Sequence, residues 1–267
     1  MPRHRFSRLL LTGAAGGLGR VLRPRLAAYC DRLRVSDHAA LGDAAAHEEL
    51  APAALQDGAA VLALLQGVDA VVHLGGVSVE AAFERILQAN IVGVFNLYEA
   101  ARKQGVKRIV FASSNHVVGF YRQNEVLDTR VPPRPDTLYG VSKAFGENLA
   151  SMYHDRYGIE TVCLRIGSAT PQPENRRMLA TWLSHDDLER LVIAGLTAPS
   201  AGHTVIYGTS DNATRWWDNT LAGHLGYRPR DSADPWRDEL EAVEPLDPRN
   251  AAQTWQGGAF VHLGPYD

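Results

Sequence analysis

The chain has 267 residues, of which 45% are hydrophobic, and a formal net charge of -3. This size suits one α/β domain with a sizeable core, and the lack of basic excess argues against nucleic acid as a partner. No apolar run reaches the ~18 residues that span a bilayer, and the two cysteines, Cys30 and Cys163, form no zinc or redox pattern. We expect a cytoplasmic protein with buried, reduced thiols and no metal, membrane or nucleic-acid partner.

Short β-forming runs alternate with helical runs along the chain. Strands are predicted at residues 8–12, 33–36, 70–74, 108–112, 160–166 and 204–207. Helices are predicted at residues 18–29, 59–65, 79–103, 138–157 and 185–196. This alternation predicts a Rossmann-type α/β fold, in which a doubly wound parallel sheet is covered by helices on both faces.

The second half of the chain adds irregular segments to this pattern. Residues 122–135 hold three prolines and predict a loop across the carboxyl edge of the sheet. His185-Asp186-Asp187 resembles a metal cluster, but a helix start with an acidic first turn explains it better. From about Ser168 the chain is rich in Pro, Trp and Asp. We expect a single domain, 1–267, in which residues 168–267 contribute a small substrate lobe over that edge.

A glycine-rich turn, Gly13-Ala14-Ala15-Gly16-Gly17-Leu18-Gly19, follows the first predicted strand. Gly13 permits the tight turn, Gly16 permits close approach of a pyrophosphate, and Gly19 permits close packing of the next helix on the sheet. The helix start, with Gly17 and Leu18, then offers free N–H groups to phosphates. A glycine turn without a ligand is the simpler alternative, but its position at the first strand-to-helix junction favours a dinucleotide.

The end of the second strand bears on which dinucleotide binds. An acid about twenty residues after the glycine turn holds the adenosine ribose in such folds, and Asp37 stands there. A carboxylate accepts from both ribose hydroxyls and repels a 2′-phosphate, so NAD is favoured over NADP. Arg34 would favour NADP, but it precedes the strand end and is expected to be solvated.

Three polar residues form a candidate proton-transfer group. Tyr139 and Lys143 are four residues apart, which places them one turn apart on one helix face. A phenol titrates near pH ~10 on its own, and a neighbouring ammonium favours the phenolate, so Lys143 is expected to lower the pKa of Tyr139. Ser114 ends an earlier apolar run.

Glycine turn, serine, tyrosine and lysine in this order resemble the extended branch of the short-chain dehydrogenase/reductase superfamily. The resemblance implies NAD binding, with Leu74-Gly75-Gly76 and Ala169 beside the cofactor. Asn90-Ile91-Val92-Gly93 matches the central helix of that family, and we interpret Asn90 as a structural organiser of the cofactor site and Gly93 as a close-packing position. One departure is the adenine side, where Ala53-Ala54-Leu55 stands in place of the usual acid and Asp57 comes two residues late.

More specific wording narrows the resemblance further. Residues 113–116 (Ser-Ser-Asn-His), 138–143, 165–168 and 177–178, with Trp216-Trp217-Asp218-Asn219 and Gln256-Gly257-Gly258, are similar to the uronate dehydrogenase family. The resemblance implies NAD-dependent oxidation of C1 of cyclic galacturonate or glucuronate to an aldarolactone. In that reaction Tyr139 would be the base, Ser114 would orient the hydroxyl, and Lys143 would contact the nicotinamide ribose.

A uronate also needs partners for its ring hydroxyls and its carboxylate. Ser78, Asn115, His116 and Ser168 are candidates for the hydroxyls, and Arg177 for the carboxylate, because a guanidinium holds a carboxylate bidentately. Three of these residues have an alternative role. His116 would bond backbone, Asn115 would cap a turn, and Ser78 would be the N-cap of the helix from residue 79. Arg176 competes with Arg177.

Two other functions share the motifs. A nucleotide-sugar epimerase or dehydratase would hold NAD tightly, but only about 100 residues follow Gly167 to build its larger lobe. A non-catalytic NAD sensor has no need of Ser114, Tyr139 and Lys143 together. We expect a homo-oligomer that assembles through the long helices.

Overall fold

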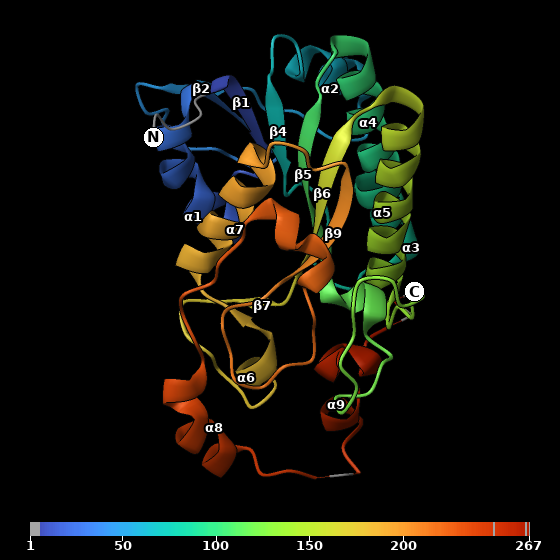
Figure 1. Cartoon of the computed structure of the whole chain (residues 1–267). Coiled ribbons are helices and arrows are strands. Elements are labelled where there is room, and N and C mark those ends of the chain that lie inside the picture. Colours follow the sequence, from blue (N-terminus) through green and yellow to red (C-terminus); the bar gives the residue numbers. More distant parts are fainter. Residues whose placement is uncertain (1–5, 248, 265, 267) are drawn as a thin grey trace.

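A seven-stranded parallel sheet forms the centre of the protein, shown as a computed structural model in Figure 1. The structure describes residues 6–247, 249–264 and 266. In spatial order the strands are β3 (Glu48–Leu50), β2 (Cys30–Ser36), β1 (Phe6–Thr12), β4 (Ala70–His73), β5 (Arg108–Ser114), β6 (Glu160–Ile166) and β9 (His203–Gly208). The order reverses between β1 and β4, the usual site of a ligand crevice in doubly wound sheets.

Helices cover both faces of the sheet. One face carries α1 (Gly17–Leu26) and α7 (His185–Thr197), and the other carries α2 (Gly58–Leu64), α4 (Gly93–Gln104) and α5 (Leu138–Tyr157) (Figure 1). Successive strand residues point to opposite faces. Leu9 and Leu11 therefore join the cluster under α1 and α7, and Leu10 joins the cluster under α2, α4 and α5. These findings confirm the predicted Rossmann-type fold.

The predicted elements agree with the structure except at particular places. All six predicted strands are present, and β3 was missed because its three residues, Glu48–Leu50, include two acids and no alternating pattern. The helix predicted at 79–103 is wrong at its start. It begins as α3 (Phe83–Ile86), passes through a π-helical segment (Leu87–Val92) and continues as α4.

Below the carboxyl ends of the strands lies a lobe of short elements (Figure 1). It contains β7 (Ser168–Ala169), α6 (Met178–Thr181), β8 (Trp182–Leu183), α8 (Arg237–Val243) and α9 (Ala251–Thr254). The proline-containing segment 122–135 has no helix, as predicted, and Leu127 N donates to Trp216 O in this region (2.8 Å). Trp216 and Trp217 are buried in one apolar cluster, so they anchor the lobe.

Several smaller expectations concern single residues. Cys30 and Cys163 are both buried as thiols, and neither forms a disulfide with a described residue, as predicted. His185 opens α7, which Ser184 caps by accepting from Asp187 N. Among the described residues, no helix is long and apolar enough to cross a bilayer, and no group of three His, Cys, Asp or Glu side chains is arranged to hold a metal.

Candidate active site

A cavity of about 970 Å³ opens at the carboxyl ends of β1, β2, β4, β5 and β6. The structure brings together there every residue that the sequence predicted for the site except Asn90. The lining includes Gly13, Gly16, Gly17, Leu18, Gly19, Asp37, Leu74, Gly75, Gly76, Ser78, Ser114, Asn115, His116, Tyr139, Lys143, Ser168, Ala169 and Arg177.

The glycine turn is shaped by close backbone contacts. Gly13 has φ +70°, a conformation that glycine adopts without strain. A Cβ at Gly19 would lie 2.1 Å from Gly13 O, so only glycine allows α1 to start against the turn. Gly16, the N-cap of α1, has no side chain to cap it, and Gly17 has open space where a Cβ would stand. The first turn of α1 thus presents N–H groups to the cavity.

Asp37 lies directly after β2 and lines the cavity. Its carboxylate accepts from Ala15 N and Ala39 N, each at 3.0 Å, which ties it to the glycine turn. Arg34 is not solvated, contrary to the prediction. Its guanidinium pairs with Glu49 at 2.9 Å and donates to Leu64 O, because β3 brings Glu49 beside β2. Arg34 does not line the cavity.

On the adenine side, Asp57 is the N-cap of α2. Its carboxylate accepts from Ala59 N and Ala60 N at 3.0 Å, so it is engaged outside the cavity lining. Leu55 lines the cavity instead, and it also packs on Gly93, where a Cβ would lie 2.7 Å from Leu55 Cβ. The close packing predicted at Gly93 is therefore confirmed.

Asn90 does not line the cavity, so the structure gives no support to a direct contact between Asn90 and a cofactor. Its side chain accepts from Val77 N (2.8 Å) and donates to Val77 O (2.9 Å) and Ser142 Oγ (2.9 Å). These bonds join the turn after β4 to α5. The structure favours the role of organiser.

The start of α5 is held against the end of β5. Thr137 caps the helix by accepting from Gly140 N (3.1 Å), and Glu80 accepts from Tyr139 N (2.8 Å). A Cβ at Gly140 would lie 2.4 Å from His116 O, so glycine permits this approach. As a result Tyr139 lies beside Ser114, and Lys143 Nζ donates to Ala112 O at 2.8 Å.

The pKa of Tyr139 shifts in the direction opposite to the prediction. Burial raises the pKa of Tyr139 to about 12, although the Ser114 hydroxyl favours the phenolate. Burial also lowers the pKa of Lys143 to about 8. Lys143 Nζ lies 5.5 Å from the centre of the Tyr139 ring and donates its hydrogen bond to the backbone carbonyl of Ala112. The predicted lowering of the Tyr139 pKa is wrong for the structure, because desolvation outweighs the favourable contacts.

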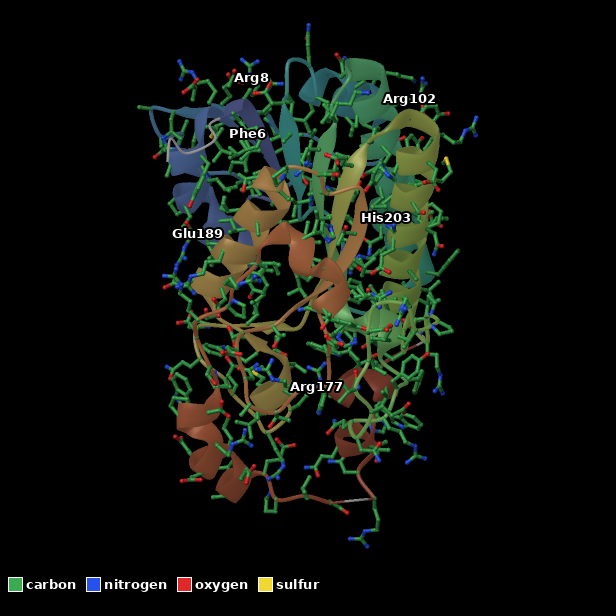
Figure 2. The ribbon with its side chains drawn as sticks, in the orientation of Figure 1. Phe6, Arg8, Arg102, Arg177, Glu189 and His203 are labelled. Carbon is green, nitrogen blue, oxygen red and sulfur yellow. The ribbon has the colours of Figure 1, made fainter. Side chains whose placement is uncertain are left out.

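Arg177, which Figure 2 labels in the lobe below the sheet, contributes a guanidinium to the lining of the cavity. It donates through Nε to Gln256 O (2.7 Å) and through Nη1 to Ser168 Oγ (3.1 Å). Asn115, with its amide nitrogen toward Ile166 O (3.0 Å), turns its oxygen to Arg177 Nη2 (2.6 Å). No carboxylate of the described chain lies within ion-pair distance of Arg177, and burial lowers its pKa to about 10.

His116 and a residue that sequence reasoning missed form a second polar pair. His116 Nδ1 lies 2.7 Å from Asp136 Oδ2, and the Asp136 side chain is fully buried. The His116 ring stacks on Phe260 at 3.8 Å between centroids. No motif or spacing signalled Asp136, which directly follows the proline-containing segment. Ser78 lines the cavity but is not a helix cap, since the N-cap of α3 is Ala82.

Comparisons with known proteins identify the family of this chain. Residues 9–197 match the NAD dependent epimerase/dehydratase family. The chain is 58% identical over 263 residues to uronate dehydrogenase of Pseudomonas putida, covering 98% of both chains. It is 54% identical to uronate dehydrogenase of Agrobacterium fabrum, covering 96% of this chain and 97% of that one.

Solved structures extend the similarity to three dimensions. The structure superposes on a uronate dehydrogenase variant from Agrobacterium tumefaciens complexed with NAD, with TM-score 0.94, 52% identity and coverage of 97% and 98%. It matches glucuronic acid dehydrogenase from Chromohalobacter salexigens with TM-score 0.95, 51% identity and the same coverage. The chain therefore belongs to the NAD-dependent epimerase/dehydratase family and, within it, to the uronate dehydrogenase group of NAD-dependent dehydrogenases.

Proposed function

We propose that this enzyme oxidises C1 of cyclic galacturonate or glucuronate to the aldarolactone, with NAD as acceptor. The observation that carries the proposal is the guanidinium of Arg177 in the same cavity as Ser114 and Tyr139, without a carboxylate partner in the described chain. Burial outweighs the attraction of the Asp136 carboxylate and lowers the Arg177 pKa, so this partly buried guanidinium is a site for an anionic ligand. The high identity to uronate dehydrogenases supports the same anion, a sugar carboxylate.

The residues present fit NAD. The uncapped first turn of α1 offers N–H groups for the pyrophosphate. We propose that Asp37, which lines the cavity after β2, accepts hydrogen bonds from the adenosine ribose. The remaining cofactor contacts that we propose come from Leu74, Gly75, Gly76, Tyr139, Lys143 and Ala169, all of which line the cavity. When bound, NAD supplies the hydride acceptor.

The protein contributes proton transfer and orientation. Oxidation breaks the C1–H and O–H bonds of the C1 hydroxyl and forms the C1=O bond of the lactone. Tyr139, as phenolate, takes the hydroxyl proton, and Ser114 orients the hydroxyl and favours the phenolate. Lys143 is charged at pH 7, because its pKa of about 8 lies above that pH. We propose that this ammonium contacts the nicotinamide ribose.

The sugar is placed by contacts at its other end. Arg177 holds the carboxylate, and Ser168 and Asn115 fix the guanidinium that receives it. Ser78, Asn115, His116 and Ser168 contact ring hydroxyls. Because Arg177, Ser168 and Gln256 belong to residues 168–267, we propose that this part of the single domain is the substrate lobe.

One assay tests the function. Purified protein is mixed with NAD and either galacturonate, glucuronate or glucose, and NADH absorbance is followed. Both uronates should give NADH, and glucose should give far less because it has no carboxylate for Arg177. Absence of NADH with both uronates, or retention of NAD through gel filtration without turnover, would contradict the proposal and favour an epimerase.

The assembly and location are further parts of the proposal. Phe83, Phe95 and Val141 are exposed on α3, α4 and α5, which supports a homo-oligomer that covers these helices. Light scattering on the purified enzyme measures the assembly directly. We propose a reducing, cytoplasmic compartment, because Cys30 and Cys163 are buried thiols that form no disulfide with a described residue.

A further inference from the structure

A buried carboxylate lies behind the cavity wall that His116 forms. The Asp136 side chain is fully buried, and its Oδ2 is 2.7 Å from His116 Nδ1. Within the described chain, His116 is the only basic side chain at ion-pair distance from Asp136, and the Arg177 guanidinium adds an attraction at longer range. A charge buried in this way has a cost that only a specific partner offsets. The His116–Asp136 pair is therefore a specific contact of the site.

The backbone is built around this carboxylate. A Cβ at Gly119 or at Gly257 would lie 2.0 Å from Asp136 Oδ2, so glycine at both positions leaves room for it. The other oxygen, Oδ1, accepts from Thr137 Oγ1 at 3.0 Å. The two oxygens thus have different partners, and the carboxylate has one orientation.

The pair decides which nitrogen of His116 carries a proton. A carboxylate only accepts hydrogen bonds, so Nδ1 must be the donor. The neutral imidazole then has an unprotonated Nε2, which is an acceptor. Nε2 makes no hydrogen bond with any described residue, and His116 lines the cavity.

The ring is also fixed in its plane. Phe260 stacks on His116 at 3.8 Å with 20° between the planes, and Tyr139 approaches it edge-on at 5.9 Å. The acceptor is therefore held beside the proposed base. We propose that Asp136 is a positioning residue, which holds His116 as the Nδ1–H tautomer. Nε2 then accepts a hydrogen bond from a ring hydroxyl of the uronate, a step that rests on the proposed function.

Asp136→Asn tests this with almost no change in shape. Thr137 Oγ1 accepts from Gly140 N and donates to Oδ1, so the oxygen of the new amide is held on the Thr137 side. The amide nitrogen then faces Nδ1 and donates to it. His116 must carry its proton on Nε2, which turns the acceptor in the cavity into a donor.

The kinetic consequence is specific to the sugar. A site that bonds a substrate hydroxyl loses much of its discrimination when that bond is lost. We expect the KM for uronate to rise and kcat/KM to fall by roughly ten- to hundred-fold, while the Kd for NAD stays unchanged. Asp211→Asn, which removes an exposed carboxylate paired with Arg215, is the matched control and should keep native kinetics.

The pH profile gives a second readout. The groups that face His116 are Asp136, Arg177 and Tyr139. Burial has the largest effect on the His116 pKa and brings it below its ordinary value of 6.5. Asp136 raises this pKa and Arg177 lowers it. Protonation of Nε2 removes the acceptor, so kcat/KM for uronate should fall as pH drops through the His116 pKa. In Asp136→Asn this acid limb should weaken and move to lower pH, because Nε2 already has its proton and the charge that favours imidazolium is gone.

Nitrogen-15 NMR of the imidazoles reads the tautomer without any activity, and His116→Gln assigns the signal. The native enzyme should show protonated Nδ1 and bare Nε2, and Asp136→Asn should show the reverse. Protonated Nε2 in the native enzyme, or an Asp136→Asn enzyme with native KM and pH profile, would overturn the inference. If the native enzyme does not oxidise uronates at all, the proposed function fails instead, so the two failures are distinguishable.

Discussion

Arg176 and Arg177 are adjacent in sequence but serve different parts of the molecule. Arg177 lines the cavity and donates to Gln256 O and Ser168 Oγ. Arg176 instead places Nη2 3.5 Å from Glu241 Oε1 of α8 and donates through Nη1 to Glu244 O. The sequence left the choice between Arg176 and Arg177 open, and these contacts favour Arg177 as the group available to a substrate carboxylate.

Arg177→Leu should lower kcat/KM on glucuronate by roughly ten- to hundred-fold, because a charge-assisted contact is worth about 1.5–3 kcal/mol. Its activity on glucose or galactose should change little, since these sugars lack the carboxylate. Arg176→Leu is the matched control and should leave uronate oxidation near native. Equal losses on charged and neutral sugars, or a selective loss in Arg176→Leu, would move the carboxylate site elsewhere.

Tyr139→Phe should lower kcat by about 10²-fold or more, the usual scale for a lost acid–base group. The Phe ring fills the same buried volume beside His116, so folding and the Kd for NAD should remain native. Stopped-flow NADH formation and NAD titration measure the two quantities. Near-native turnover would rule out Tyr139 as the base.

Lys143 predicts a pH dependence of stability. Burial lowers its pKa from 10.5 to about 8, so between these pH values the unfolded state binds more protons than the folded state. Stability from this group therefore rises with pH in that window, by about 3 kcal/mol in total. Urea unfolding at pH 7.5 and pH 10 measures it. The free energy of unfolding of the native enzyme, relative to that of Lys143→Met, should increase from pH 7.5 to pH 10. An unchanged relative free energy would contradict the shifted pKa.

Asp37→Ala should raise the KM for NAD and narrow the preference for NAD over NADP, because it removes both the ribose acceptor and the repulsion of a 2′-phosphate. Part of the KM effect will come from the glycine turn, since Asp37 accepts from Ala15 N. Asp37→Asn separates the two effects, because an amide keeps an acceptor without the charge. Equal use of both cofactors by the native enzyme would show that Asp37 does not select NAD.

Local pattern determined the fold and most of the candidate site. Apolar runs, helical periodicity and glycine spacing act over a few residues, so the six long strands and the frame of helices could be read directly. In a parallel sheet the residues that follow the strands meet at one edge. For this reason Gly13, Asp37, Ser114 and Ser168 could be placed at one cavity without any coordinates.

What only the tertiary structure decided depends on contacts between distant segments. The Arg34 side chain pairs with Glu49 because β3, too short to show a pattern, joins the sheet. The pKa of Tyr139 rises because several elements bury it together, and burial is not a local property of sequence. Asp136 reaches His116 because Gly119 and Gly257, far apart in the chain, both make room for its carboxylate.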